Sequence, residues 1–319
     1  VHLPHGAFLG NIDQFIQGFD PGEPDRLSIT VADRWFWVHP VVLSMIASLA
    51  VKLEKKNINC QQITARSGHY LERMGLFKFL GVKSGMEISE HDPSGRFIPL
   101  TQIINSDQLT KFITEMIPML HLEPKQAEPI RYIVSELVRN VLEHAETKYG
   151  AILCAQYFKK SNTIRIGIAD TGIGVRKSLS RSHVTSDDID AIKLALMPGV
   201  TGTTSREGGT ALNAGAGLFF IKSIAYTNRN FFIIYSGSGM YKLLRKKEIG
   251  GLVLHANPYL DRHSESKNLP MWDGVIIGID ISLDSTNEFT TLLDLIRDTY
   301  SKAIRERRDQ RYRKQAKFI

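Results

Sequence analysis

Residues 130–146 read IRYIVSELVRNVLEHAE, and this stretch decides the fold. Its apolar residues recur at steps of three and four, which predicts a helix with one stripe facing a core. At about 100° per residue, Glu136, Asn140 and His144 lie one turn apart along one border of that stripe. A half-exposed polar edge gives the same pattern, so the interpretation depends on the residues that follow. The apolar stripe consists of Ile130, Ile133, Val134, Leu137, Val138, Val141 and Leu142.

Length and composition indicate an ordinary globular protein. The chain has 319 residues, of which 43% are hydrophobic and 23% charged, and its length suggests about two domains. No apolar run approaches the roughly 18 residues that a membrane span needs, and the opening VHLPHGAFLG does not resemble a signal peptide. We therefore expect a cytoplasmic protein with no membrane partner. Cys60 and Cys154 lack neighbours at ligand spacing, so neither a disulfide framework nor a zinc site is indicated.

The net charge of +7 is concentrated at the C-terminal end. Residues 302–317 hold eight basic and two acidic side chains, which gives +6 and leaves the rest of the chain close to neutral. This run predicts a basic C-terminal helix within residues 286–319. Such a helix can bind phosphates or an acidic partner, but a solvated helix end fits the pattern as well. Nucleic acid is thus a possible partner that the sequence does not favour.

The N-terminal part predicts a small α/β unit. Residues 1–25 are rich in Gly, Pro and Asp and indicate an irregular lead-in. Residues 26–90 alternate strand-like and helix-like segments, and residues 91–125 are interpreted as a linker and docking helix.

The unit at residues 26–90 resembles a STAS-like domain, the module of sulphate transporters and anti-sigma-factor antagonists. The resemblance rests on a strand entering a helix in FWVHPVVLSMIASL and on Met74-Gly75-Leu76 leading to Phe79-Leu80-Gly81. Antagonists carry an Asp-Ser pair at the strand-to-helix corner, where this chain has His39-Pro40. The resemblance therefore implies a module for binding a partner protein or for dimerisation rather than a phosphoryl acceptor.

Two glycine-containing segments follow the central helix. The strand-like TIRIGIA (residues 163–169) runs directly into Asp170-Thr171-Gly172-Ile173-Gly174. An acid at a strand end followed by glycines places a hydrogen-bond acceptor beside a backbone that a flat molecule can approach. Residues 175–214 are interpreted as a mobile lid that contributes little to the core. Gly215-Ala216-Gly217-Leu218 then opens an apolar helix, and the free N–H groups and positive dipole of such a helix start suit phosphate.

In this order and spacing, these segments resemble the GHKL or Bergerat-fold ATPases, which include DNA gyrase, the large heat-shock chaperones, mismatch-repair clamps, histidine kinases and anti-sigma-factor kinases. The resemblance covers residues 126–285. It implies an α/β fold, a two-layer α/β sandwich with a mixed, mostly antiparallel sheet. Glu136-x-x-x-Asn140 is similar to the family's first motif, and His144-Ala145 is closest to the anti-sigma-factor kinase branch.

The resemblance also implies ATP and Mg²⁺ as cofactors and assigns roles to individual residues. Asn140 would coordinate Mg²⁺, Asp170 would accept the adenine amino group, and Glu136 would be the catalytic base. Many relatives have Gly-Thr in the final strand where this chain has Gly274-Val275, so that hydroxyl is either missing or supplied by Thr171. The remaining nucleotide-binding positions are His144, Gly172, Gly174, Thr201, Gly215, Ala216, Gly217 and Leu218.

Several functions fit these motifs. The first is a regulatory ATPase that slowly hydrolyses Mg·ATP, in which lid closure switches contact with a partner protein. The second is a serine/threonine protein kinase of the anti-sigma-factor type, and the third is a non-catalytic nucleotide-binding signalling module. DNA processing is less favoured because little after Leu283 resembles a transducer domain, and neither His91 nor His121 lies on a helix suited to a sensor histidine kinase. A homodimer is possible, and the pathway, signalling or defence, stays open.

Overall fold

The computed structural model describes residues 1–19, 25–32, 36–63, 67–84, 96–202, 217–245, 254–284 and 289–315. The N-terminal part contains five short strands, four α-helices and a 3₁₀ turn within the described residues. In chain order these are β1 (His2–Leu3), β2 (Gly6–Ala7), α1 (Ile12–Gln17), β3 (Leu27–Val31), β4 (Trp37–Val38), α2 (Pro40–Ala50), η1 (Lys55–Asn57), β5 (Ile58–Cys60), α3 (Gly68–Arg73) and α4 (Leu76–Leu80).

The second part carries the large sheet and the longest helices. Its elements in chain order are β6 (Phe97–Ile103), α5 (Ser106–Lys111), η2 (Phe112–Met116), η3 (Ile117–Leu120), α6 (Pro124–His144), β7 (Ala151–Phe158), η4 (Lys159–Ser161), β8 (Thr163–Ala169), α7 (Gly174–Leu179), α8 (Asp188–Ala195), α9 (Gly217–Thr227), β9 (Phe232–Gly237), β10 (Gly239–Leu243), η5 (Pro258–Leu260), β11 (His263–Ser266), β12 (Trp272–Ser282) and α10 (Phe289–Gln315).

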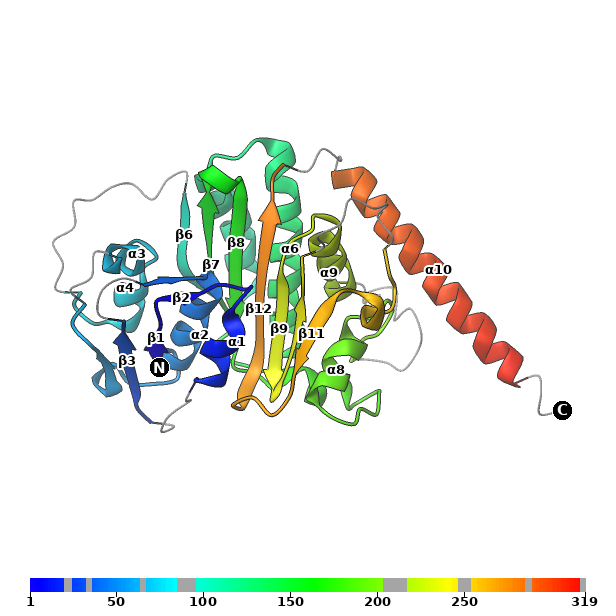
Figure 1. Cartoon of the computed structure of the whole chain (residues 1–319), viewed down its shortest axis with the longest axis horizontal. Coiled ribbons are helices and arrows are strands. Elements are labelled where there is room, and N and C mark those ends of the chain that lie inside the picture. Colours follow the sequence, from blue (N-terminus) through cyan, green and yellow to red (C-terminus); the bar gives the residue numbers. More distant parts are fainter. Residues whose placement is uncertain are drawn as a thin grey trace.

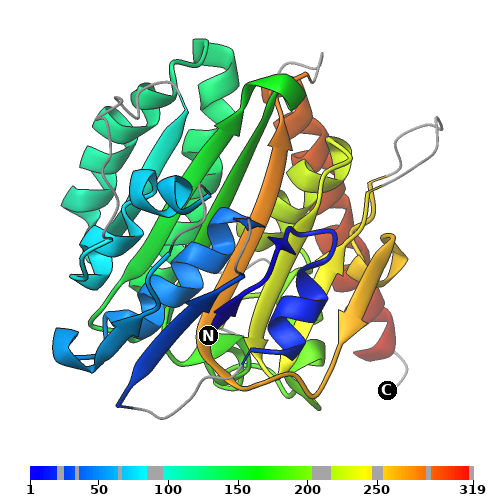
Figure 2. The same cartoon turned by 60° about the vertical axis from the view of Figure 1, so that its left-hand side comes forward.

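A seven-stranded sheet forms the centre of the molecule (Figures 1 and 2). Its strand order is β11-β10-β9-β12-β8-β7-β6, and the neighbouring strands pair antiparallel. The prediction of a mixed α/β fold with a large, mostly antiparallel sheet is confirmed. The expected helix at residues 130–146 is the C-terminal two thirds of α6, which a capping box at Glu123 and Gln126 begins.

Both faces of this sheet are buried, each in its own core. In β8, Ile164, Ile166 and Ile168 point into the core that α6 and α9 cover, whereas Ala169 joins the core built by the N-terminal part. Successive strand residues point to opposite faces, so the isoleucines of TIRIGIA alternate with Thr163, Arg165 and Gly167. The guanidinium of Arg165 packs over the rings of Phe8 and Phe158, which covers this polar side chain.

Helix α2 lies directly on the second face of the sheet, across β8 and β7 (Figure 2). Gly167 permits this close approach, because an added Cβ there would overlap the backbone nitrogen of Val41. Ser44 on α2 donates a hydrogen bond to the carbonyl of Gly167 at 2.9 Å. The N-terminal part therefore packs against the sheet as a third layer, beyond the two layers that the motifs imply.

The corner residue His39 belongs to this contact. It caps the N-terminus of α2 through Nδ1, and its Nε2 lies 3.1 Å from the buried carboxylate of Asp280 on β12. Burial lowers the pKa of His39, and Asp280 opposes that shift. His39 is fully buried, so the corner links the N-terminal part to the sheet and presents no accessible group.

Two segments contain more regular structure than expected. The lead-in at residues 1–25, expected to be irregular, holds β1, β2 and α1, and its apolar residues, such as Leu3, Ile12 and Ile16, are fully buried in the second core. The segment at residues 91–125, expected to be a linker and docking helix, contains α5 and also β6, which pairs with β7 as an edge strand of the large sheet. Composition does not indicate these strands, because long-range packing determines their structure.

The predicted lid at residues 175–214 is only in part described. Its first part, up to residue 202, forms α7 and α8, and Val175, Leu179, Ile189 and Ile192 are buried in the main core. The expectation that this part builds little core is therefore wrong. Its apolar residues recur at helical spacing and pack against the ends of β9, β10 and β12. Residues 203–216 lie outside the described part of the chain.

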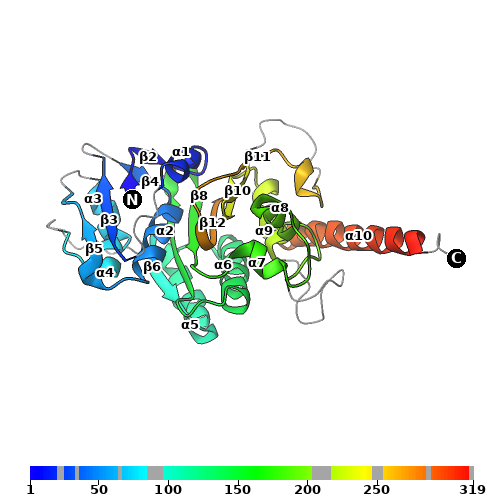
Figure 3. The same ribbon diagram turned by 90° about the horizontal axis from the view of Figure 1, so that it is seen from below.

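Helix α10 begins beside α6 and α9 and then extends away from the body (Figures 1 and 3). Leu292, Leu293 and Ile296 are buried against the main core, and the basic residues follow in the second half of the helix. Among the helices that the structure describes, none combines the length and the apolar character needed to cross a bilayer.

We predict that Gly167→Ala lowers the free energy of unfolding by about 3 kcal/mol or more, because the added methyl group forces α2 away from β8. Thermal or denaturant unfolding of the whole chain measures this change. Gly6→Ala is the matched control, since its Cβ would have 3.9 Å to the nearest atom. Equal stability of the two variants would contradict the close contact between α2 and β8.

Candidate functional site

A cavity of about 380 Å³ lies between α6, α7, the segment after α8 and the start of α9. Ile168, Val275 and Ile277 of the sheet form its floor, and Val175, Leu179 and Val200 add apolar walls. The structure brings most of the residues selected from the sequence to this cavity. Those that line it are Glu136, Asn140, His144, Asp170, Gly174, Thr201, Gly217 and Leu218.

The other selected residues are placed differently. Gly172 does not line the cavity, but its N–H donates to Asp170 Oδ1 at 2.8 Å. An added Cβ at Gly172 would overlap the carbonyl of Ala145 at the end of α6, and Ile173 N–H donates to that carbonyl at 2.9 Å. The glycine therefore lets the 170–174 loop pack against α6. Gly215 and Ala216 lie outside the described residues.

Asp170 is a buried carboxylate at one end of the cavity, with 2% of its surface exposed. Burial raises its pKa to about 7, while hydrogen bonds from the backbone of Gly172 and Val275 oppose the rise. Trp272 Nε1 donates to the Asp170 carbonyl at 3.0 Å, and Gly274, at φ 103°, leaves room for the side chain. Asp170 is thus held rigidly with its acceptor oxygens beside an apolar cavity.

The polar edge of α6 forms a side wall of the cavity. Glu136, Asn140 and His144 all line it, as the helical spacing predicted. Glu136 is half-buried, and burial raises its pKa, with Arg139 opposing the rise and Glu143 adding to it. Nε2 of His144 lies 3.8 Å from Oε2 of Glu143.

The start of α9 approaches this polar edge closely. A Cβ added to Gly217 would lie 2.8 Å from Glu136 Oε2 and 3.5 Å from Asn140 Nδ2. The first N–H groups of a helix have no partner within the helix and carry partial positive charge. An anionic group at this point would meet the helix start and the Asn140 amide together.

One buried polar atom of a lining residue, Nδ2 of Asn140, has no hydrogen-bond partner among the described residues. A buried donor without a partner costs about 1–3 kcal/mol, so it calls for a ligand or water. A phosphate oxygen would satisfy the Asn140 amide. Oγ1 of Thr171 is likewise buried without a partner among the described residues, but Thr171 does not line the cavity. The Asn140 amide, the buried acceptor at Asp170 and the close approach of Gly217 to the polar edge of α6 fit an adenine nucleotide.

A bound Mg²⁺ would depend on few protein ligands. Within the described ranges, no cluster of three or more His, Cys, Asp and Glu side chains has the arrangement of a metal site. Mg²⁺ commonly takes one or two protein oxygens when phosphates and water complete its octahedron. The oxygen of the Asn140 amide fits that pattern, since a side-chain amide can turn to present either oxygen or nitrogen.

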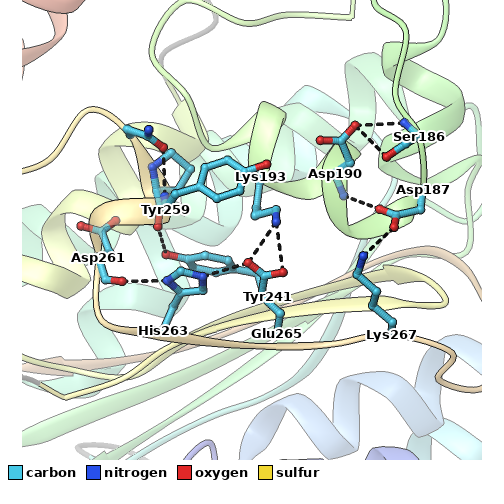
Figure 4. Close-up of polar contacts among 12 residues, drawn as sticks. Ser186, Asp187, Asp190, Lys193, Tyr241, Tyr259, Asp261, His263, Glu265 and Lys267 are labelled. Carbon is cyan, nitrogen blue, oxygen red and sulfur yellow. Dashed lines mark hydrogen bonds and ion pairs between the residues drawn. The ribbon is translucent and has the colours of Figure 1, made fainter.

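Salt bridges fix the walls of the cavity from outside (Figure 4). Lys193 on α8 donates to both carboxylate oxygens of Glu265 on β11 at 3.0 Å, and Lys267 pairs with the α8 N-cap Asp187 at 2.8 Å. On α9, the fully buried Lys222 pairs with the buried Asp261. These contacts attach α8 and α9 to β11 and its flanking residues. They thereby position the parts of the cavity wall that Ala195, Thr201 and Gly217 form.

Sequence reasoning missed several lining residues. Tyr132 lies four residues before Glu136, so extending the polar row of α6 by one turn would have found it. Arg139 lies three residues after Glu136, so including the neighbouring row of the helix would have found it. Ser178 lies one turn after Gly174 on α7, inside the segment taken for a lid. Only the tertiary structure reveals that this turn faces the cavity.

Comparison with known proteins gives no relative for this chain, since no protein-family model matches it and a search of curated proteins found no match. The function therefore has to be argued from the cavity itself.

The raised pKa of Asp170 predicts that nucleotide affinity depends on pH. The ionised form of Asp170 can accept a hydrogen bond from an amino group, and its pKa of about 7 places that ionisation near neutrality. We expect affinity for adenine nucleotides to rise between about pH 6 and about pH 8 as the carboxylate loses its proton. Calorimetric titrations with Mg·ATP across this range measure the effect.

Asp170→Asn is the control, because residue 170 then cannot ionise, while the nucleotide and the other groups of the cavity, such as Glu136, are unchanged. The same pH slope in wild type and Asp170→Asn would contradict a role for the carboxylate. Stability should change in the opposite direction in wild type. The folded state holds the Asp170 proton more tightly than the unfolded chain, whose Asp pKa is about 3.9, so stability falls as pH rises through this window.

Proposed function

We propose that this protein is a regulatory ATPase that binds Mg·ATP in the cavity between α6 and α9. The observation that carries the proposal is the distribution of polar groups around one cavity with an apolar floor. A buried carboxylate acceptor, Asp170, lies at one end, and the start of α9 meets Glu136 and Asn140 at another wall. A flat apolar base with an amino group suits the first end, and phosphates suit the second.

The proposed arrangement assigns a task to each group. Asp170 binds the exocyclic amino group of adenine, and Ile168, Val275 and Ile277 contact the base. The N–H groups at Gly217 and the Asn140 side chain bind the phosphates. Mg²⁺, when bound, would neutralise phosphate charge and orient the terminal phosphate.

Glu136 supports hydrolysis as the reaction. Its side chain is 27% exposed, so a water molecule can reach it, and burial raises its pKa. A carboxylate with a raised pKa is a stronger base toward that water. The water oxygen attacks the γ-phosphorus, the bond to the β,γ-bridging oxygen breaks, and ADP leaves with that electron pair. Glu136 takes the proton of the attacking water.

Contacts between α10 and the cavity walls support a switch that nucleotide binding operates. Tyr132 lines the cavity and packs against Phe289 of α10, with ring centroids 6.0 Å apart. Further along α10, Arg307 donates to the carbonyl of Pro198 at 2.8 Å, beside the Val200–Gly202 wall. A shift of either wall on nucleotide binding would move α10 and its basic end. We propose that this movement changes contact with a partner protein at α10 or at the STAS-like N-terminal part.

A serine/threonine protein kinase of the anti-sigma-factor type is the second candidate. The same Glu136 would take the proton of a protein hydroxyl instead of water. The corner at His39 is fully buried, so an acceptor hydroxyl would have to come from another protein or from another part of this chain.

We predict that Glu136→Gln lowers ATP turnover by about 100-fold, because it removes the base and keeps the size of the side chain. Phosphate release measures turnover, and the affinity for Mg·ATP should stay within about threefold. Glu143→Gln is the matched control, since it removes a more exposed carboxylate from the same wall. Turnover should change little in this control.

Radiolabelled ATP distinguishes the candidates in the same experiment. Label released as inorganic phosphate supports the ATPase, and label retained on protein supports the kinase. Equal turnover above background in wild type and Glu136→Gln would contradict the role of Glu136 as the base. ATP binding without turnover above background in wild type would leave a nucleotide-binding module without catalysis and contradict both enzymatic proposals.

A further inference from the structure

The described lining of the cavity has more acidic than basic side chains, which disfavours an anionic ligand. Three carboxylates line it, those of Glu136, Glu143 and Asp170. Arg139 is the one Arg or Lys side chain among the described lining residues. A triphosphate brings several negative charges into this acidic surrounding, so its binding needs compensating cations.

In the structure, Arg139 interacts with a carboxylate of the cavity. Its Nη1 lies 3.9 Å from Glu136 Oε1, and the two residues are three apart on α6. The Arg139 side chain is 61% exposed. An exposed pair at this distance is weak, typically about 0.3–0.5 kcal/mol for helix neighbours, so the guanidinium can leave Glu136 at little cost.

A phosphate is a better partner for Arg139 than Glu136 is. Guanidinium presents a planar fork of N–H donors that matches two phosphate oxygens at once. Phosphates bound at the start of α9 would lie close to Arg139, because Gly217 faces both Glu136 and Asn140, the neighbours of Arg139 on α6. No large movement of the backbone is needed for this change of partner.

We propose that Arg139 is a further catalytic residue, which leaves Glu136 and binds the terminal phosphates of the nucleotide. This inference rests on the proposed function. The exchange has two effects. It places a positive charge beside the phosphates in a cavity that has three carboxylates. It also releases the Glu136 carboxylate to accept the proton of the attacking water. When Arg139 binds the phosphates it leaves Glu136, so phosphate binding and activation of the Glu136 base occur together.

The test compares nucleotides that differ only in their phosphates. Affinities for AMP and for Mg·ATP are measured by calorimetry on the full chain for wild type, Arg139→Gln and Arg139→Lys. Arg131→Gln is the matched control, because it makes the same change on the exposed surface of the same helix, outside the cavity. Circular dichroism and thermal unfolding verify that each variant is folded.

The expected result is a selective loss. Arg139→Gln should weaken Mg·ATP binding about tenfold and leave AMP binding within about twofold, since only the terminal phosphates lose a partner. Arg139→Lys should retain part of the Mg·ATP affinity, because it keeps the charge but not the fork. Arg131→Gln should match wild type for both nucleotides.

A double-mutant cycle tests the exchange itself. Glu136→Gln should tighten Mg·ATP binding, because Arg139 no longer has to leave a carboxylate, and this gain should shrink in the Arg139→Gln background. An unchanged difference between AMP and Mg·ATP in Arg139→Gln, or a gain that is the same in both backgrounds, would overturn the inference. Failure of the proposed function is distinct, because wild type itself would then bind neither nucleotide.

Discussion

Strand β8 lies between two cores, and the rest of the structure depends on how it packs on both faces. Its isoleucines point toward α6 and α9, while Gly167 on the opposite face lets the backbone of α2 come into direct contact. A side chain at Gly167 would push α2 away, because its Cβ would overlap the backbone of Val41. The sheet is therefore shared between the N-terminal part and the half of the chain that forms the cavity.

The same strand positions the candidate site. β8 ends at Ala169, and the chain then turns through Asp170 and the glycine loop, which packs against the end of α6. The polar edge of α6 and the start of α9 reach the cavity from the first face of the sheet. On the second face, α2 packs directly on β8 and β7, so the N-terminal part contacts the strand that ends at the site.

Local patterns in the sequence predicted much of the central half. The spacing on α6 placed Glu136, Asn140 and His144 on one wall, and the end of an apolar strand placed Asp170 at the cavity, because both features follow from the geometry of single elements. Packing between distant segments was not predictable in this way. The positions of α2 and β6, and the cavity-facing turn at Ser178, depend on contacts between residues far apart in sequence. Composition alone also does not predict the structure of the lead-in and of the first part of the predicted lid, whose apolar residues join the two cores.

The most direct test of this account is a crystal structure of the full chain with Mg²⁺ and a non-hydrolysable ATP analogue. The account predicts the adenine amino group within hydrogen-bonding distance of the Asp170 carboxylate, and the phosphates at the N–H groups of Gly217 with Asn140 beside them. A nucleotide bound elsewhere on the molecule, or bound with its base at the start of α9, would contradict the account. Crystals grown at saturating analogue in which the cavity contains only water would contradict it as well.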